Sequence, residues 1–358
     1  MKNLFRFFGI ITLAAIIIFS MSACDELFFG ASQDDLTGTN TSKGDENENG
    51  GDNNGNVWSD MTWTAVTDSK FPNGSSDYIR AIAYGGDKFV AGGSNGRMAY
   101  SYDGITWTAV ENSTFAGDIY SIDYGHGLFV AVGYNAWVAY SYDGITWSGG
   151  NGFSLFGSNG PIPCVTHNES MFLAASGDGT IAVWPEGEGW KRTASFLFYG
   201  DGTEDITYGA GKFILVGGSG KMSASSDGTN WTTVTNNTFS KDQYGNIHSI
   251  AYVGGKFIAG GVKRMVYSSD GEIWITVPDS SFRNYGVRGI AYGNGTFVAG
   301  GDFGKIETST DGISWKAVRD SKFPLLSGTD LPVTIYSIAY GGGRFVAVGH
   351  KGSMSYSN

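Results

Sequence analysis

Cysteine, proline and charge are all scarce in this sequence, and the shortages exclude several classes of protein. The chain has 358 residues but only two cysteines and seven prolines, and 16% of its residues are charged. So few cysteines cannot form a disulfide framework, so the fold must depend on a hydrophobic core. The 56 glycines and 15% aromatic residues indicate many tight turns between short strands rather than disorder.

Histidine and net positive charge are also lacking. The four histidines, His126, His167, His248 and His350, are far apart and lack metal-ligand spacing, so we predict no metal and no cofactor. No phosphate-binding loop or nucleophile elbow is present. The net charge of −11 argues against a nucleic-acid partner.

The N-terminus carries the features of an export signal. Lys2 and Arg6 precede an uncharged apolar run over residues 7–19, and small residues then lead to Cys24. The run is too short for a comfortable membrane span, so we predict a signal peptide over residues 1–23.

The stretch Met21-Ser22-Ala23-Cys24 resembles the lipobox of bacterial lipoproteins. The resemblance implies cleavage before Cys24 and a diacylglycerol group on its thiol. The protein would then be exported and held on a bacterial membrane by the lipid, at the periplasmic face or the cell surface. An ordinary signal peptide cut near Ala23, or an uncleaved anchor, is the alternative.

Residues 24–57 follow as a polar, low-complexity segment. From Asp25 to Val57 the chain has eight acidic residues against Lys43, a net charge of −7. Such a segment cannot bury enough apolar surface to fold, and we expect a flexible tether. With Cys24 acylated, Cys164 has no partner for a disulfide, and its apolar surroundings predict a buried structural thiol.

A repeat of about 42 residues organises the rest of the chain, residues 58–358. Its clearest marker is a tryptophan at steps of 44, 40, 43, 41, 43 and 41 residues. These tryptophans are Trp63, Trp107, Trp147, Trp190, Trp231, Trp274 and Trp315.

Each repeat contains four short segments rich in Val, Ile, Tyr and Phe between glycine turns, which predicts an antiparallel meander. One meander cannot cover both of its apolar faces, whereas meanders stacked around an axis can. We therefore predict an all-β fold, a seven-bladed β-propeller of four-stranded blades. The inner strands are expected to start at Ile79, Ile119, Ile162, Thr203, Ile247, Val287 and Ile335.

The two ends of this domain complement one another. The last repeat stops after its third strand, and residues 62–66 match the fourth strand of the first repeat, residues 106–110. We expect the N-terminal strand to complete the C-terminal blade, which leaves no open edge in the ring.

The turn before the tryptophan has a recurring sequence. It reads SYDGITW at residues 101–107 and 141–147, SSDGTNW at 225–231, SSDGEIW at 268–274 and STDGISW at 309–315. These turns resemble Asp-box (BNR) repeats of sialidase-like β-propellers and of photosystem assembly factor propellers. The family form has one more residue between Asp and Gly, and the third repeat lacks the motif.

The aspartates of these turns have a structural explanation. Each can accept hydrogen bonds from backbone N–H groups of its own turn, while the next glycine supplies a positive φ. Five copies of one turn suit a repeated fold better than an active site, so we predict no catalytic residue among them. The five are Asp103, Asp143, Asp227, Asp270 and Asp311.

The opposite face, with the long variable connections, is the predicted ligand side. We expect the second residue of each inner strand to surround the mouth of a central channel. The candidates there are Arg80, Tyr120, Glu204, His248, Arg288 and Tyr336, with Pro163 in the third repeat. A second set follows the second turn of each blade, and its candidates are Arg97, Trp137, Lys221, Arg264 and Lys305. They are explained by ordinary strand-end polarity, which keeps a propeller soluble, and the sharper alternative is a basic, aromatic-dotted surface for an anionic or sugar-like ligand.

The sequence thus favours a membrane-anchored, monomeric binding or scaffolding module, with a protein, peptide or glycan as its partner. The alternative is a sialidase-like glycan-processing enzyme. Sialidases use an arginine triad, a Tyr–Glu pair and an acid, and the second inner-strand positions supply only two arginines, Arg80 and Arg288. The Arg-Ile-Pro motif is absent as well, and sialidases have six blades.

Overall fold

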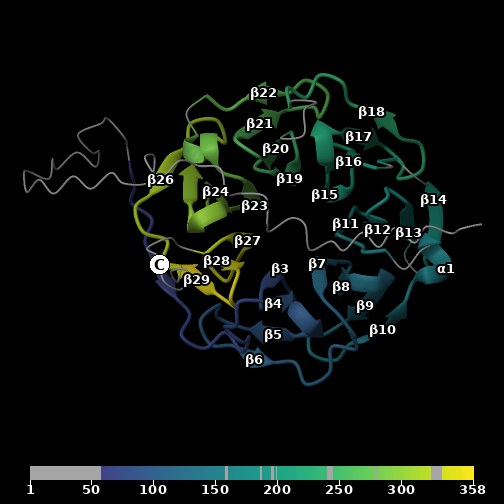
Figure 1. Ribbon diagram of the computed structural model, residues 1–358, viewed down its shortest axis with the longest axis horizontal. Coiled ribbons are helices and arrows are strands. Elements are labelled where there is room, and N and C mark those ends of the chain that lie inside the picture. The colour runs from purple at the N-terminus through teal and green to yellow at the C-terminus, as the bar shows by residue number, and fades with distance from the viewer. Residues whose placement is uncertain are drawn as a thin grey trace, which may run out of the picture. The chain divides into compact units, whose positions relative to one another are not determined.

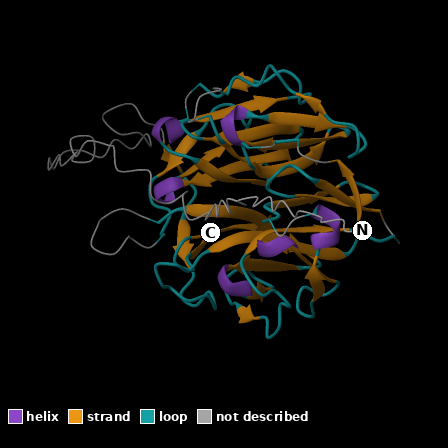
Figure 2. Cartoon of the chain, turned by 45° about the vertical axis from the view of Figure 1, so that its right-hand side comes forward, coloured by secondary structure: helices purple, strands orange, loops and turns teal. Residues whose placement is uncertain are grey.

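The computed structural model describes residues 58–157, 160–185, 188–194, 197–198, 200–239, 245–278, 280–323 and 333–358. The predicted signal peptide, Cys24 and the tether lie outside these residues. The described part is an all-β propeller in which seven sheets surround a common axis (Figure 1). Strands dominate it and its helices are single turns (Figure 2), among them α1 (Phe153–Phe156). Within the described part, no helix is long and apolar enough to cross a membrane.

Every blade is an antiparallel meander of four strands, and the seven blades follow one another around the axis. The innermost strands are β3 (Ile79–Gly85), β7 (Ile119–Gly125), β11 (Cys164–His167), β15 (Thr203–Gly209), β19 (Ile247–Val253), β23 (Val287–Gly293) and β27 (Ile335–Gly341). The second strands are β4 (Lys88–Gly93), β8 (Leu128–Gly133), β12 (Met171–Ala175), β16 (Lys212–Gly217), β20 (Lys256–Gly261), β24 (Thr296–Gly301) and β28 (Arg344–Gly349).

The outer half of each blade is shorter. The third strands are β5 (Met98–Ser101), β9 (Trp137–Ser141), β13 (Ile181–Pro185), β17 (Met222–Ser225), β21 (Arg264–Ser268), β25 (Ile306–Ser309) and β29 (Met354–Ser357). The outermost strands are β6 (Thr108–Ala109), β10 (Ser148–Asn151), β14 (Lys191–Ala194), β18 (Thr232–Thr233), β22 (Ile275–Thr276), β26 (Lys316–Val318) and β2 (Trp63–Ala65).

The hydrophobic core lies between the blades. The second strand of blade one, KFVAGG, is buried along its whole length because neighbouring sheets cover both of its faces. Between blades one and two, Val90 and Met98 pack with Ile119 and Ile122 in one cluster. This explains why the strands read as continuous apolar runs rather than as an alternation of apolar and charged residues.

The ring closes as the repeat predicts. β2 pairs antiparallel with β29, with Trp63 opposite Ser357 and Ala65 opposite Ser355. A further strand was not predicted: β1 (Trp58–Ser59) pairs in parallel with the outermost strand of blade six, β26. The N-terminal segment therefore contacts two blades, because it crosses the outer edge of blade six before it completes blade seven.

Blade three differs from the prediction at its start. Its inner strand begins at Cys164, whereas Ile162 was expected, because Pro161 and Pro163 have no N–H group to donate to a ladder. The thiol of Cys164 is fully buried, as predicted, and burial raises its pKa well above the ordinary value.

The five aspartate turns have the expected geometry. In blade one, the Asp103 carboxylate accepts hydrogen bonds from the N–H groups of Ile105 at 2.8 Å and Thr106 at 2.7 Å. Gly104 has φ of 73°, and the ring nitrogen of Trp107 donates to the Gly104 carbonyl at 3.3 Å. The same pair of backbone bonds is present at Asp143, Asp227, Asp270 and Asp311.

The second turns meet the interblade segments on the opposite face of the ring, here called the second-turn face. In blade one the Ser94 N–H donates to the Tyr78 carbonyl at 2.9 Å. In blade two the Tyr134 N–H donates in the same way to Asp118 at 2.8 Å. Each inner strand thus begins on the second-turn face, and its first residues lie beside the second turn of their own blade.

Candidate functional site

A β-bulge interrupts the inner strand at its second residue in six of the seven blades. In blade one, Ile79 pairs with Gly93 and Ala81 with Gly92, which leaves Arg80 outside the ladder. A bulge bends a strand and redirects a side chain, so one residue per blade is freed at the axis. The six residues, called the axial ring below, are Arg80, Tyr120, Glu204, His248, Arg288 and Tyr336.

Side chains of the axial ring meet across blade boundaries. The Arg80 guanidinium lies 5.5 Å from the Tyr120 ring of blade two and 5.3 Å from the Tyr336 ring of blade seven. The Arg288 guanidinium of blade six lies 5.8 Å from Tyr336 on its other side. On the far side of the axis, the Glu204 carboxylate lies 3.8 Å from the His248 ring nitrogen.

The inner strand of the third blade has no bulge. Pro163 stands where the other blades place an axial-ring residue, directly before β11, and this strand pairs regularly from Cys164 to His167. The axial ring therefore has its least polar position between Tyr120 and Glu204.

Three further residues at this site were not identified from the sequence. The Tyr78 hydroxyl donates to the Asp118 carboxylate, and the Tyr78 ring lies 4.3 Å from the Arg80 guanidinium. Desolvation and the bond to Asp118 raise the pKa of Tyr78. In blade six, the Asp302 carboxylate accepts from Arg288 Nε at 2.7 Å. Desolvation lowers the pKa of Arg288, but the charge of Asp302 and its hydrogen bond outweigh this effect. The pKa of Arg288 is therefore above its ordinary value.

The cationic candidates of the second turns do not join the axial ring. Each instead contacts the interblade segment that leads into its own blade. Arg97 pairs with Asp77 at 3.3 Å, and Lys221 pairs with Asp201. Arg264 donates to the Thr238 carbonyl, and Lys305 lies 4.1 Å from the Tyr285 ring.

The aromatic candidate of the second turns, Trp137, packs on the interblade segment as well. Its ring lies 6.4 Å from Phe115, in the cluster between blades one and two. The structure therefore gathers six of the predicted candidates at the axis and places the other five against connecting segments.

The predicted basic surface is mixed in charge. Two carboxylates, Asp118 and Asp302, lie within hydrogen-bond distance of Tyr78 and Arg288, and Glu204 is itself acidic. Acids in the interblade segments pair with two of the second-turn cations. Among the described residues, no three His, Cys, Asp or Glu side chains gather in a way that could hold a metal ion.

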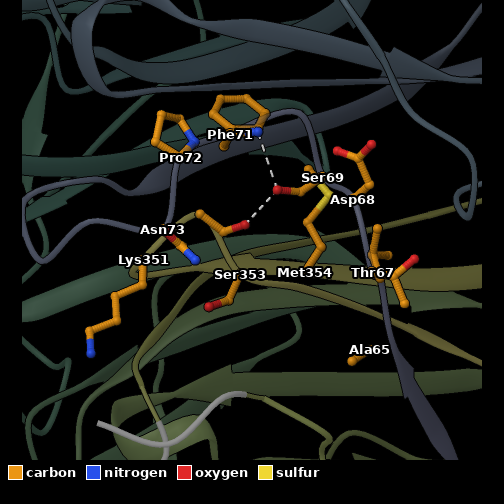
Figure 3. A pocket seen from close by; sticks show the side chains of 12 residues that line it. Ala65, Thr67, Asp68, Ser69, Phe71, Pro72, Asn73, Lys351, Ser353 and Met354 are labelled. Atoms are coloured by element: carbon orange, nitrogen blue, oxygen red, sulfur yellow. Dashed lines mark hydrogen bonds between the residues drawn. The ribbon is translucent and has the colours of Figure 1, made fainter. Parts of the chain in front are cut away.

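A separate cavity of about 380 Å³ lies on the same face, beside the strand that closes the ring (Figure 3). The Ser69 hydroxyl donates to the Gly352 carbonyl at 2.7 Å and accepts from the Phe71 N–H at 3.3 Å, as the dashed lines show. Its walls come from residues 65–69, 71–73 and 351–354, so no residue of the axial ring lines it.

This architecture defines the chain as a seven-bladed β-propeller. No protein-family model matches the sequence, and no curated protein matches it. Among solved structures, it is similar to YCF48 bound to D1 peptide, at 17% identity and a TM-score of 0.62 over 84% of this chain and 98% of that chain.

Two other propellers match over a similar length. The WD40 β-propeller domain of Doa1 has 15% identity and a TM-score of 0.61, covering 83% of this chain and 97% of its own. A catalytically inactive virginiamycin B lyase from Staphylococcus aureus, solved with quinupristin, has 8% identity and a TM-score of 0.66, covering 84% and 99%. At these identities the likeness concerns the fold alone.

Proposed function

We propose that the protein is a binding or scaffolding module that holds a peptide or protein at the axial ring. The observation that carries this proposal is the bulge repeated in six blades, because it turns one side chain per blade out of the ladder toward a common point. Bulged positions of this kind often occur at functional sites. The likeness to YCF48 bound to D1 peptide supports a peptide or protein as the ligand.

Site-specific crosslinking tests this proposal. A photoreactive amino acid replaces Tyr120 in the axial ring, and a matched variant carries it at Tyr142, which is 75% exposed in an aspartate turn on the opposite face. We expect a partner to be crosslinked from position 120 and not from position 142. The purified partner should then bind the native chain and lose affinity for Tyr120→Ala. Equal crosslinking from both positions, or undiminished binding by Tyr120→Ala, would contradict the proposal.

We also propose that a lipid on Cys24 holds this module on a bacterial membrane. The support is the sequence of residues 1–24, with its basic start, short apolar run and terminal cysteine. The mass of the mature N-terminal peptide tests it, since it should begin at Cys24 and carry a diacylglycerol. Cys24→Ala should release the chain from the membrane fraction, and an unmodified N-terminus would refute the anchor.

The five aspartate turns are, we propose, Asp-box repeats shortened by one residue. Their carboxylates make the same two backbone bonds in all five turns, and the tryptophan ring nitrogen donates to the glycine carbonyl in four of them, which supports a shared origin. In relatives of this chain, the Ser, Asp, Gly and Trp positions should be retained together. Independent loss of these four positions would argue against it.

A further inference from the structure

Most charged groups near the axial ring are paired by the fold itself. Asp118 accepts from the Tyr78 hydroxyl and from the Asn95 N–H at 2.9 Å. Asp302 accepts from Arg288 at 2.7 Å and from the Gly286 N–H at 2.7 Å. These carboxylates are thus bound to neighbours of fixed position, and the charge of Arg288 is already balanced by Asp302, which weakens its attraction for an anionic ligand.

Arg80 is held differently. Its guanidinium lies against three tyrosine rings, Tyr78, Tyr120 and Tyr336, at 4.3, 5.5 and 5.3 Å from their centroids. Ring faces attract a cation without neutralising it and without accepting its N–H groups in the plane. Nε of Arg80 is buried and has no hydrogen-bond partner among the described residues. A guanidinium oriented in this way can bind a carboxylate with two parallel hydrogen bonds.

Glu204 is the second charged residue of the axial ring whose side chain makes no hydrogen bond within the described part of the chain. Its ion-pair partner is His248, whose ring nitrogen stands 3.8 Å away, beyond hydrogen-bond distance, and its carboxylate also acts electrostatically on Arg288. The Glu204 side chain is 36% exposed, whereas the His248 side chain is 14% exposed. A cation reaching the axis would therefore meet this carboxylate without breaking a hydrogen bond.

Arg80 and Glu204 carry charges of opposite sign and lie on opposite sides of the axis. Arg80 belongs to β3 of blade one and Glu204 to β15 of blade four, and Figure 1 shows these strands across the axis from one another. Tyr120 and Pro163 separate them along one side of the ring. The aromatic rings of Tyr336 and His248, with the paired Arg288, separate them along the other.

We propose that the axial ring binds a ligand with one anionic and one cationic group, the anion on Arg80 and the cation on Glu204. This inference rests on the proposed binding function and names the chemistry of its ligand. Such a ligand is either a peptide segment with an acidic and a basic side chain or a small free zwitterion. A purely anionic ligand would satisfy Arg80 but would place negative charge near Glu204 and Asp118.

The test uses the full-length chain and a library of end-blocked hexapeptides. Each peptide has one Glu and one Lys at varied spacing, and matched peptides carry Gln in place of either residue. The best two-charge peptides should bind at least about tenfold more tightly than either matched peptide. Free glycine and unblocked diglycine form a second arm, and charge-dependent binding of these alone identifies a small zwitterion as the ligand.

Single variants assign each charge to its residue. Arg80→Gln should abolish the preference for Glu and leave the preference for Lys, and Glu204→Gln should do the reverse. Arg97→Gln is the matched control, because Arg97 pairs with Asp77 away from the axial ring, and it should leave both preferences unchanged. The double variant Arg80→Glu/Glu204→Arg should restore two-charge binding with the order of Glu and Lys reversed.

The outcomes separate this inference from the proposed function. Peptides that bind, and that lose affinity with Tyr120→Ala but show no charge preference, would overturn the two-charge ligand and leave the binding function intact. Absence of any binding by peptide, zwitterion or crosslinked partner would overturn both. Melting temperatures of all variants close to that of the native chain exclude loss of the fold as the cause.

Discussion

Aromatic rings packed on glycines, four of them tyrosines and one a histidine, join successive inner strands. In five of the blade contacts, an aromatic ring lies directly over the glycine at the end of the preceding blade's inner strand. The pairs are Tyr124 on Gly85, His167 on Gly125, Tyr252 on Gly209, Tyr340 on Gly293 and Tyr84 on Gly341. A ring can approach the backbone so closely only where no Cβ intervenes, and this accounts for glycine at these positions.

Gly293→Ala should therefore destabilise the ring. An added Cβ would stand 2.0 Å from the Tyr340 ring, so the ring must move, and we expect a loss of about 1–3 kcal/mol in the free energy of unfolding. Gly150→Ala is the control, since no atom lies within 4 Å of a Cβ built there on β10. Denaturant titration measures both variants, and equal losses would show that the tyrosine contact is not the cause.

The aspartate turns make the stability of the fold depend on pH in the acidic range. Backbone N–H groups of Ile273 and Glu272, together with Ser268, hold the pKa of Asp270 at about 2. The folded-state pKa is below the value of about 4 in an unfolded chain, so the stabilisation is present above pH 4 and is lost as pH falls toward 2. The melting temperature should fall over this window. Asp270→Ala should cost about 1 kcal/mol of unfolding free energy at pH 7. Its melting temperature should then fall less between pH 4 and pH 2 than that of the native chain. An equal fall in both proteins would contradict a stabilising role for the Asp270 carboxylate.

At the scale of the strands, the sequence predicts most of the fold and only part of the site. Tryptophan and glycine recur with the repeat, so they locate blades, turns and the closing strand. The bulges leave no such signal, because they depend on how inner strands converge at the axis. Asp77 and Asp201, which pair with second-turn cations, lie in connections that share no repeat, so the sequence predicts a basic surface where the structure has ion pairs.

Inner strands of neighbouring blades are also joined by side-chain acceptors. Asp205 of β15 accepts from the Ile250 N–H of β19 at 2.8 Å and from its neighbour Ile206 at 2.8 Å. Two residues along, the Thr207 hydroxyl accepts from the Tyr252 N–H at 3.1 Å. Desolvation between these strands raises the pKa of Asp205 to about 7. Blades four and five are thus linked through a carboxyl group that titrates near neutrality.

Substitutions of Asp205 separate its role as a hydrogen-bond acceptor from the effect of its ionisation. Asp205→Ala leaves the Ile250 N–H without an acceptor and should cost about 1–3 kcal/mol. Asp205→Asn keeps an acceptor but cannot ionise. Because the folded-state pKa lies above the unfolded value, the native chain loses stability as pH rises from about 4 to 7. Asp205→Asn should flatten this slope and melt above the native chain at pH 8, and a parallel slope would refute the linkage.

At the scale of the whole molecule, stability depends on an N-terminal segment that contacts two blades. Trp63 is 2% exposed and belongs to the cluster between blades six and seven, with Phe323, Ile335 and Phe345. The two residues of β1 extend the sheet of blade six, while β2 completes the sheet of blade seven. Contacts between residues about 290 positions apart, such as Trp63 with Ser357, convert an open arc of blades into a ring.

Removal of residues 58–66 should consequently open the ring. Loss of the buried Trp63 alone corresponds to about 3–5 kcal/mol, and the deletion also exposes the edge of β29. We expect the melting temperature to fall by on the order of 10 °C or more, together with a tendency of the exposed edge to pair between chains. Scanning calorimetry and size-exclusion chromatography measure the two effects.

Deletion of residues 25–50 is the control, because the predicted tether should contribute nothing to the propeller. An equal fall in both deletions would mean that the acidic segment belongs to the folded domain, and retention of the native melting temperature without residues 58–66 would mean that six complete blades and one of three strands suffice to hold the ring closed.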